Sequence, residues 1–313
     1  MSGSVYCCGY GSPNAVVWRL QKSNLSKIAE TVESAVSIDG LAEDTDYIYC
    51  GANEGGSIYK VWKIQKSDMS VVAKSINYGS SIYTLTSNNT YGDDLYVYCA
   101  GAGSRKVWKI QKSDMSKVAE SIAYGSNYIN ALASNSDFIF IGGHPDGIGV
   151  WKLWKNSLAY IQASPDYVNS IYALTCEDSQ YVYCGGGKNS ATVWKISIGA
   201  MSKVAESPSY GYIYTLTQDT DYVYCGGTTK KVWKIQKSDM SKIAESVDIG
   251  GYIRALAEDE SYIYAGGNNN KIWKIQKSDM SKIAESANYG SVLYTAIGDD
   301  IEVLVNEYKA WIM

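Results

Sequence analysis

The chain repeats one phrase along its whole length. VWKIQKSDMSKVAES at 107–121 returns as VWKIQKSDMSKIAES at 232–246, and returns again at 272–286 with one further Val-to-Ile exchange. The tryptophans that mark these and the looser copies are spaced by 44, 46, 43, 43, 39, 40 and 38 residues. They are Trp18, Trp62, Trp108, Trp151, Trp194, Trp233, Trp273 and Trp311. A period of about 40 residues built from strand-like segments is typical of a β-propeller.

A single repeat predicts four strands. In one copy they are IYTLT at 213–217, YVYCGG at 222–227, KVWKIQK at 231–237 and SKIAES at 241–246, each bounded by Gly, Asp or Ser. Four antiparallel strands per period form a propeller blade, and we call them A to D from the axis outward. We therefore expect an all-β fold, a β-propeller of four-stranded antiparallel blades, in a single domain spanning 1–313.

The number of tryptophan periods predicts the number of blades. Seven periods of 38–46 residues favour seven blades. Residues 1–31 supply strands B, C and D, and residues 293–313 supply A, B and C, so the two ends are expected to meet and close the ring. This makes thirty strands in all, two more than seven blades need. Either one terminal hairpin is surplus, or the ring has eight blades of which two are incomplete.

Composition argues against several classes of partner. The net charge of −4 gives no basic surface for nucleic acid. No apolar run is long enough for membrane insertion. The N-terminal MSGSVYCCGYGS has neither a basic segment nor an apolar one, so no secretory signal is expected and the protein is expected to be made in the cytoplasm.

The repeat also predicts which residues form the interior. Each Trp is expected to be a core residue. Cysteines at equivalent positions of neighbouring blades would be too far apart for disulfides, so they are expected to be small buried thiols. The recurring cysteines are Cys50, Cys99, Cys184 and Cys225. Lysines of the third strand are expected to bury their stems and keep their ammonium groups in water.

Side chains for catalysis are scarce. The only histidine, His144, lies in the loop HPDGIG, so neither a Cys/His metal cluster nor a Ser-His-Asp arrangement is expected. Carboxylates such as Asp44 and Asp219 recur at the A–B turn, where Asp is expected to cap its own backbone. The Gly-Gly pair that follows the second strand, as at 226–227, predicts a bulge or a turn. We expect a non-catalytic protein with no cofactor and no metal site.

The repeat resembles two known types of propeller. YVYCGG, KVWKIQK and MSKIAES follow one another as strands do in YVTN-type repeats and in quinoprotein-like (PQQ-like) repeats. The resemblance implies the fold only. SDMS stands where quinoprotein repeats have TG, and their outer-strand Trp is absent, so a quinone cofactor is not implied. Near-identical repeats also look like propellers attached to tailed-phage virions, which implies display on a virion or cell surface.

The order of strands predicts two different faces of the disc. The A–B and C–D turns form one face, here called the turn face, where the repeated QKSD predicts a uniform, solvated ring of Lys and Asp. The B–C and D–A loops form the other, the loop face, which varies between copies and is rich in Tyr, Asn, Ser and Gly, as adaptable binding surfaces are. Its candidate ligand-binding residues are Tyr78, Tyr124, Tyr167, Tyr210 and Tyr289, with His144 and Trp154 in the most divergent repeat. Alternatively, these tyrosines pack over the tops of neighbouring blades.

These patterns lead to two hypotheses about function. The first is a non-catalytic module that binds a protein partner, a receptor or a surface glycan on a virion or cell surface. The second is a structural protein that docks onto a larger assembly through the uniform turn face or the surplus terminal hairpin. An enzyme is the least favoured alternative.

Overall fold

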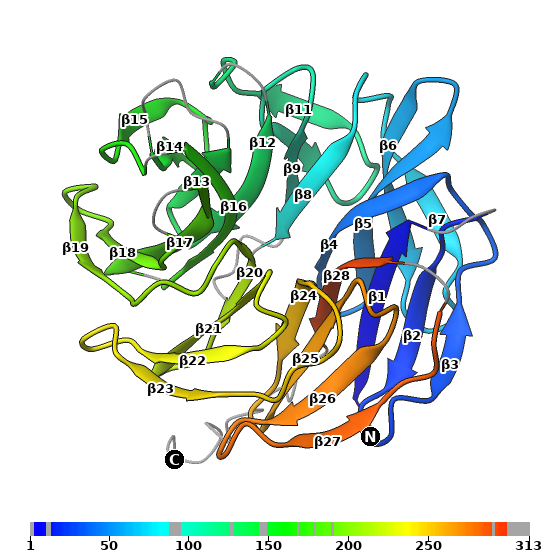
Figure 1. Cartoon of the computed structure of the whole chain (residues 1–313). Coiled ribbons are helices and arrows are strands. Elements are labelled where there is room, and N and C mark those ends of the chain that lie inside the picture. Colours follow the sequence, from blue (N-terminus) through cyan, green and yellow to red (C-terminus); the bar gives the residue numbers. More distant parts are fainter. Residues whose placement is uncertain are drawn as a thin grey trace, which may run out of the picture.

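The computed structural model describes residues 3–10, 14–87, 95–125, 128–143, 149–167, 169–177, 179–188, 191–289 and 292–298. These residues form 28 β-strands in seven four-stranded antiparallel sheets. The sheets are arranged as blades in a ring (Figure 1). The predicted propeller is confirmed, and it has seven blades rather than eight. Within the described ranges the chain has no helix capable of crossing a membrane.

The blades are numbered I to VII along the chain, and their strands are given from the innermost to the outermost. Blade I comprises β28 (Val292–Gly298), β1 (Ser4–Tyr10), β2 (Val17–Gln21) and β3 (Lys27–Glu30). Blade II comprises β4 (Ser37–Glu43), β5 (Tyr47–Gly55), β6 (Ile58–Gln65) and β7 (Val71–Lys74). Blade III comprises β8 (Ile82–Ser87), β9 (Tyr96–Gly101), β10 (Trp108–Gln111) and β11 (Lys117–Glu120). Blade IV comprises β12 (Ile129–Ser134), β13 (Phe138–Gly143), β14 (Trp151–Trp154) and β15 (Tyr160–Ala163).

The remaining blades follow the same order. Blade V comprises β16 (Asn169–Cys176), β17 (Tyr181–Lys188), β18 (Trp194–Ser197) and β19 (Lys203–Glu206). Blade VI comprises β20 (Ile213–Gln218), β21 (Tyr222–Gly227), β22 (Trp233–Gln236) and β23 (Lys242–Glu245). Blade VII comprises β24 (Ile253–Glu258), β25 (Tyr262–Gly267), β26 (Ile272–Gln276) and β27 (Lys282–Glu285). The four strands predicted at 213–246 are those of blade VI, with ends that differ by at most two residues.

The two ends of the chain close the ring. β28 supplies the innermost strand of blade I and pairs antiparallel with β1. The predicted meeting of the two ends is therefore confirmed. The rest of the predicted terminal hairpin lies at 299–313, outside the described residues, as does Trp311.

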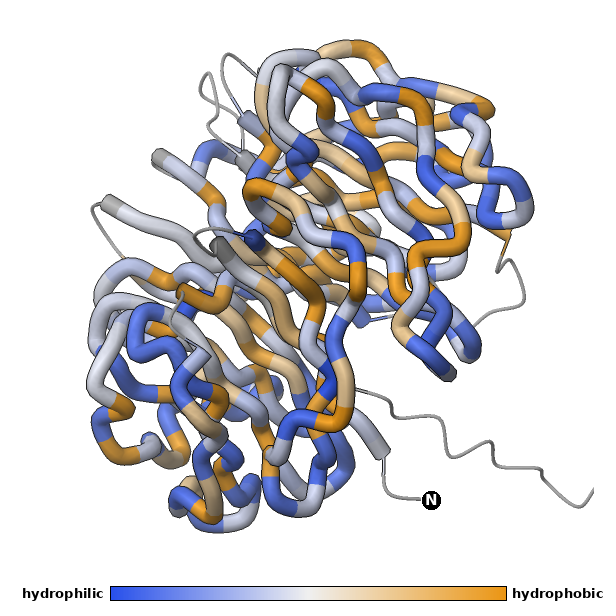
Figure 2. The backbone as a smooth tube through the Cα atoms, turned by 90° about the vertical axis from the view of Figure 1, so that its right-hand side faces the viewer, coloured by the Kyte–Doolittle hydropathy of each residue, from blue (hydrophilic) through white to orange (hydrophobic). Residues whose placement is uncertain are grey.

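Apolar side chains fill the spaces between blades. Hydrophobic residues follow the strands, and hydrophilic residues gather in the turns at the blade ends (Figure 2). The cysteines are free, and all of them except Cys176 are buried, as predicted. Five of the marker tryptophans are buried, namely Trp18, Trp62, Trp108, Trp151 and Trp194. Trp233 and Trp273 are half-buried.

The third-strand lysines are not solvated, contrary to the prediction. Lys234 in blade VI is only 7% exposed. Its Nζ donates a hydrogen bond to the backbone oxygen of Lys277 in blade VII at 2.8 Å and lies 3.9 Å from the centre of the Tyr222 ring. The equivalent residue reaches the next blade in the same way at all seven junctions, because the neighbouring C–D turn presents a carbonyl there. These donors, here called the clamp residues, are Arg19, Lys63, Lys109, Lys152, Lys195, Lys234 and Lys274.

The turn face is also less solvated than predicted. Asp44 caps the A–B turn of blade II as expected, because its Oδ1 accepts hydrogen bonds from the amides of Asp46 and Tyr47. Its Oδ2 accepts the hydroxyl of Tyr49 at 2.7 Å and lies 3.1 Å from Nζ of Lys112 in blade III. Lys112 belongs to a QKSD turn and is only 6% exposed, so the predicted ring of solvated lysines is wrong. The same Asp–Tyr–Lys triad recurs as Asp219–Tyr224–Lys277 and Asp259–Tyr264–Lys22.

Candidate functional site

Each innermost strand contains a β-bulge opposite the end of its partner strand. In blade VI, Ile213 pairs with Gly227 and Thr215 pairs with Gly226, which leaves Tyr214 as the extra residue. The Gly-Gly pair is needed there because a Cβ on Gly227 would overlap the carbonyl oxygen of Tyr212. The predicted bulge is confirmed, and it recurs in all seven blades. Bulges redirect a side chain, and they are frequent next to functional sites.

The seven bulge residues meet at the loop-face end of the central channel, because a strand A begins at that face. They line one cavity of about 260 Å³, here called the mouth. All of them are half-buried, whereas the residue before each one is buried in the core. In ring order from blade I they are Tyr294, Asp39, Tyr83, Asn130, Tyr172, Tyr214 and Arg254.

The mouth narrows onto an apolar floor. Two residues beyond each bulge, six blades contribute a leucine, and blade I contributes Ala296. These leucines are Leu41, Leu85, Leu132, Leu174, Leu216 and Leu256. The site therefore combines leucines beneath the bulge residues with a surface that is mostly polar.

Tyrosine rings form a contacting series along one side of the mouth. The ring centres of Tyr172 and Tyr214 are 5.7 Å apart. Tyr214 is also 6.4 Å from the ring of Tyr252, which lies outside the cavity and is 39% exposed. Tyr128 and Tyr212 occupy the same place before a bulge in their own blades, and they are similarly exposed. Aromatic surface thus extends from the cavity onto the loop face.

Two opposite charges lie in the mouth. Asp39 and Arg254 are the charged residues that line the cavity, and Tyr294 of blade I stands between their blades. Burial raises the pKa of Asp39 to about 6, although the hydroxyl of Ser37 donates to its Oδ2 at 3.2 Å and opposes that rise. Burial and the charge of Asp39 raise the pKa of the neighbouring Tyr83. The mouth can therefore offer aromatic faces, hydrogen-bond donors and acceptors, one cation and one titratable acid.

The tyrosines predicted from the D–A loops occupy a different place. They lie at the junctions between blades, where each ring contacts the marker tryptophan of the next blade with ring centres 4.5–5.7 Å apart. Tyr78, Tyr124, Tyr167 and Tyr210 are 3–5% exposed, and Tyr289 is half-buried. This is the packing alternative stated above. Their predicted contact with a ligand stays a prediction.

The other two predicted residues are not at the mouth. Trp154 ends β14 and starts the C–D turn, so it lies toward the turn face rather than the loop face, since strand C runs in that direction. It is 46% exposed, and its ring centre is 5.1 Å from that of Phe138. His144 lies outside the described residues.

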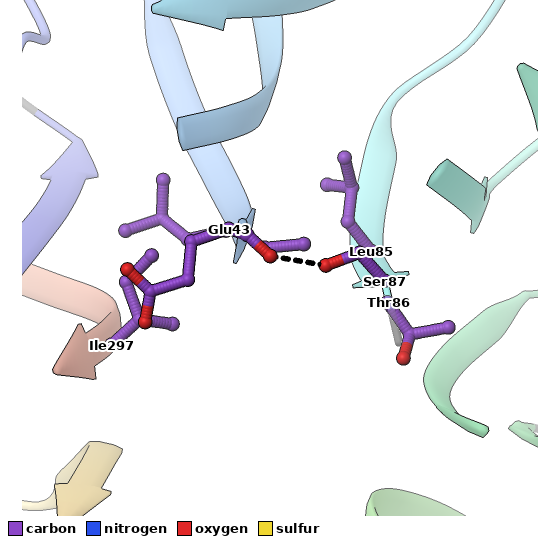
Figure 3. A pocket seen from close by; sticks show the side chains of 7 residues that line it. Glu43, Leu85, Thr86, Ser87 and Ile297 are labelled. Carbon is purple, nitrogen blue, oxygen red and sulfur yellow. Dashed lines mark hydrogen bonds between the residues drawn. The ribbon is translucent and has the colours of Figure 1, made fainter. Parts of the chain in front are cut away.

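A second cavity of about 320 Å³ lies deeper in the channel, toward the turn face. Figure 3 shows its labelled residues from blades I, II and III, including Glu43, Leu85 and Ile297. The hydroxyl of Ser87 donates to the backbone oxygen of Glu43 across the gap between two blades. The Glu43 carboxylate pairs with Nζ of Lys66 at 2.8 Å, so we assign this cavity a structural role.

The sequence analysis does not predict the mouth, because its residues resemble ordinary strand positions. A signal was nevertheless present. Within the I-x-x-L of blades II to VII, the residue after Ile changes between Asp, Tyr, Asn and Arg, while the Ile and the Leu stay constant. Among the described residues, no three or more His, Cys, Asp or Glu side chains gather as a metal site would require.

Comparison with known proteins gives no further assignment. No protein-family model matches the chain, and no curated protein matches it in sequence.

Proposed function

We propose that the protein is a non-catalytic binding module that holds the terminal unit of a glycan in the mouth. The observation that carries the proposal is that seven bulge residues of four kinds, one from each inner strand, line one cavity. A cavity of about 260 Å³ suits a terminal unit better than a long stretch of chain.

The chemistry of the mouth suits a sugar. Tyrosine rings can pack against the C–H faces of a sugar ring while their hydroxyls hydrogen-bond to its substituents. Asn130 and the two charged residues add hydrogen-bonding groups to hold the hydroxyls in one orientation. The exposed tyrosines beside the cavity can contact further units of the same glycan.

The setting that we propose is the surface of a virion or a cell, where the module would act as a receptor-binding component. Its support is the resemblance of near-identical repeats to virion-attached propellers. Detection of the protein on purified particles with an antibody tests this setting, and its absence from particles and cell surfaces would refute it.

A glycan array followed by calorimetry tests the proposed site. We expect Tyr214→Ala and Tyr172→Ala to weaken binding by about tenfold or more, because each removes an aromatic face from the mouth. Tyr160→Ala is the matched control, since Tyr160 is 49% exposed on the outer edge of blade IV. Tyr124→Ala and Tyr210→Ala should lower the melting temperature more than the affinity. The opposite pattern would move the site to the D–A loops.

A second candidate function, docking onto a larger assembly, is favoured by the outer edge of blade IV. Trp154 and Tyr160 stand where blade III has Gln111 and Lys117, and both are about half exposed. The double variant Trp154→Gln with Tyr160→Lys gives blade IV the residues of blade III at these two positions. If the edge is a docking surface, this variant should lose co-purification with the assembly and keep glycan binding.

A further inference from the structure

Arg254 is held in a fixed orientation at the mouth. Its Nε donates to Oδ1 of Asn268 at 2.7 Å. Its guanidinium carbon lies 4.8 Å from the ring centre of Tyr214 and 5.7 Å from that of Tyr294, so the group is flanked by two aromatic rings. Such flanking reduces the freedom of the side chain and leaves its two terminal nitrogens, Nη1 and Nη2, as the remaining donors.

Among the residues that the structure describes, no carboxylate is paired with the guanidinium. Buried lysines of the turn face are paired with acids, as Lys112 is with Asp44. No ion pair joins Arg254 to any acid in the described part of the chain, although it lines a partly enclosed cavity. A planar guanidinium binds a carboxylate through two parallel hydrogen bonds, a geometry that a lysine cannot provide.

We propose that Arg254 binds the carboxylate of an acidic sugar, so that the terminal unit held in the mouth is a uronic acid or a sugar acid of similar charge. This inference rests on the proposed glycan-binding function and specifies its ligand class. The tyrosines on either side of Arg254 would contact the sugar ring while the guanidinium fixes its charged end.

Asp39 makes this binding depend on pH. Tyr83 on β8 and the buried thiol of Cys8 on β1 interact electrostatically with Asp39, and Tyr294 on β28 and Arg254 line the same cavity. Its pKa of about 6 means that Asp39 is neutral in mild acid and negative at pH 8. The charged form repels a sugar carboxylate, so affinity should fall as the pH rises through about 6.

Matched sugars test the proposal by calorimetry. The probes are methyl glycosides of the gluco, galacto and manno series, each as the uronic acid and as the neutral hexose. At pH 5 we expect a uronide to bind about 10- to 100-fold more tightly than its neutral partner, the range of a charge-assisted hydrogen-bonded pair. Arg254→Gln should remove that difference, because it lowers the affinity for the uronide more than the affinity for the hexose. Arg105→Gln is the arginine control.

The outcomes separate this proposal from the function on which it rests. Equal binding of uronide and hexose, both weakened by Tyr214→Ala, would overturn the carboxylate assignment and keep the glycan site. No binding by either series would refute both. Asp39→Asn supplies a second readout. Uronide affinity should fall by roughly three- to tenfold between pH 5 and pH 8 in the natural protein and stay constant in this variant, and an unchanged pH dependence would contradict the arrangement.

Discussion

Asp39 is an acid in a buried position of the mouth, where the charged form of its carboxyl group is disfavoured. The sign of its effect follows from its pKa, which burial raises from 3.8 to about 6 in the folded protein. The folded state therefore prefers the protonated acid, and stability is lost as the pH rises from about 4 through 6. At neutral pH the rise corresponds to about 3 kcal/mol, an upper limit for a group that is partly exposed. Retaining such a residue at a cavity is characteristic of functional sites.

Asp39→Asn should therefore stabilise the protein at pH 8, by about 1–3 kcal/mol, and leave its stability at pH 4 unchanged. Urea unfolding at the two pH values, followed by tryptophan fluorescence, measures the difference. A variant that is less stable than the natural protein at pH 8 would contradict the assigned cost of the buried charge.

Gly227 shows how closely the backbone approaches itself behind the bulge of blade VI. A Cβ at this position would overlap the carbonyl oxygen of Tyr212, which is backbone and cannot rotate away. We expect Gly227→Ala to lower the free energy of unfolding by roughly 1–3 kcal/mol. Gly199→Ala is the control, because a Cβ at Gly199 would meet only the Ser197 side chain, at an ordinary distance of 3.9 Å, and blade III has Ser113 at the equivalent position. Equal melting temperatures for the two variants would refute this account.

Sequence alternation at the residue scale indicated which side chains face inward but not how the strands pair. IYTLT at 213–217 reads as a strand, but no residue within it identifies Tyr214 as the extra one. The bulge depends on the register with the next strand, which a single strand does not encode. For this reason the sequence predicts ligand binding by the tyrosines of the loops and not by those of the mouth.

At the scale of the element, the seven junctions between neighbouring blades can be compared as variants of one arrangement. Between blades IV and V the Asp–Tyr–Lys triad is replaced as a whole, with Asn135, Phe140 and Ile198 in the three positions. Phe140 and Ile198 are buried like the residues they replace. Electrostatics explains why the three residues are replaced together. If only one partner of a buried ion pair were replaced, the charge of the other would be left uncompensated.

The triad of blade II provides the test. Asp44→Asn removes the acid beside the buried Lys112 and should lower the free energy of unfolding by roughly 2–4 kcal/mol at pH 7. The triple variant Asp44→Asn, Tyr49→Phe, Lys112→Ile copies the blade IV–V junction and should recover most of that loss. Chemical denaturation of both variants measures the recovery. A triple variant less stable than the single one would show that the three positions are not coupled.

The effect should also depend on pH. Burial acts to raise the pKa of Asp44, but the Tyr49 hydroxyl, the charge of Lys112 and the turn amide of Tyr47 outweigh it and hold that pKa below its ordinary value. The stability contributed by this carboxylate is present above about pH 4 and is lost as the pH falls through the lowered pKa. The difference between Asp44→Asn and the natural protein should therefore shrink toward pH 3.

The strands themselves could be predicted almost completely at this scale. Four short alternating runs per repeat gave the strands of blade VI, and the turn role of Asp44 followed from local turn chemistry. The burial of Lys234 could not be predicted in the same way. Its hydrogen bond goes to a carbonyl of blade VII. The sequence pattern of one blade does not say where the neighbouring blade lies.

At the scale of the whole molecule, the ring depends on one late strand. β28 completes blade I, and the clamp residue Lys274 reaches the backbone oxygen of Lys22 at 2.8 Å across the closing junction. The first and last blades are thus joined by the same contact as any other pair. Equivalence of all junctions is what closure of a ring requires, because every blade then has a neighbour on each side and only short, protected strand edges remain.

Removing β28 should therefore open the ring. A chain that ends at residue 291 loses the partner of β1, and we expect it to unfold at a lower temperature, over a broader range, and to aggregate. A chain that ends at Gly298 keeps every described strand and is the control. Circular dichroism melting and size-exclusion chromatography compare the two. A cooperative, monomeric chain without β28 would contradict closure by this strand.

The bulges leave the seven mouth positions outside the regular ladder of paired residues. Exchanging one of these side chains need not disturb the blade that carries it, and the other six remain as they were. A single substitution in the mouth can therefore change which ligand is bound without changing how the blades assemble. A library randomised only at these seven codons would sample many specificities on one scaffold.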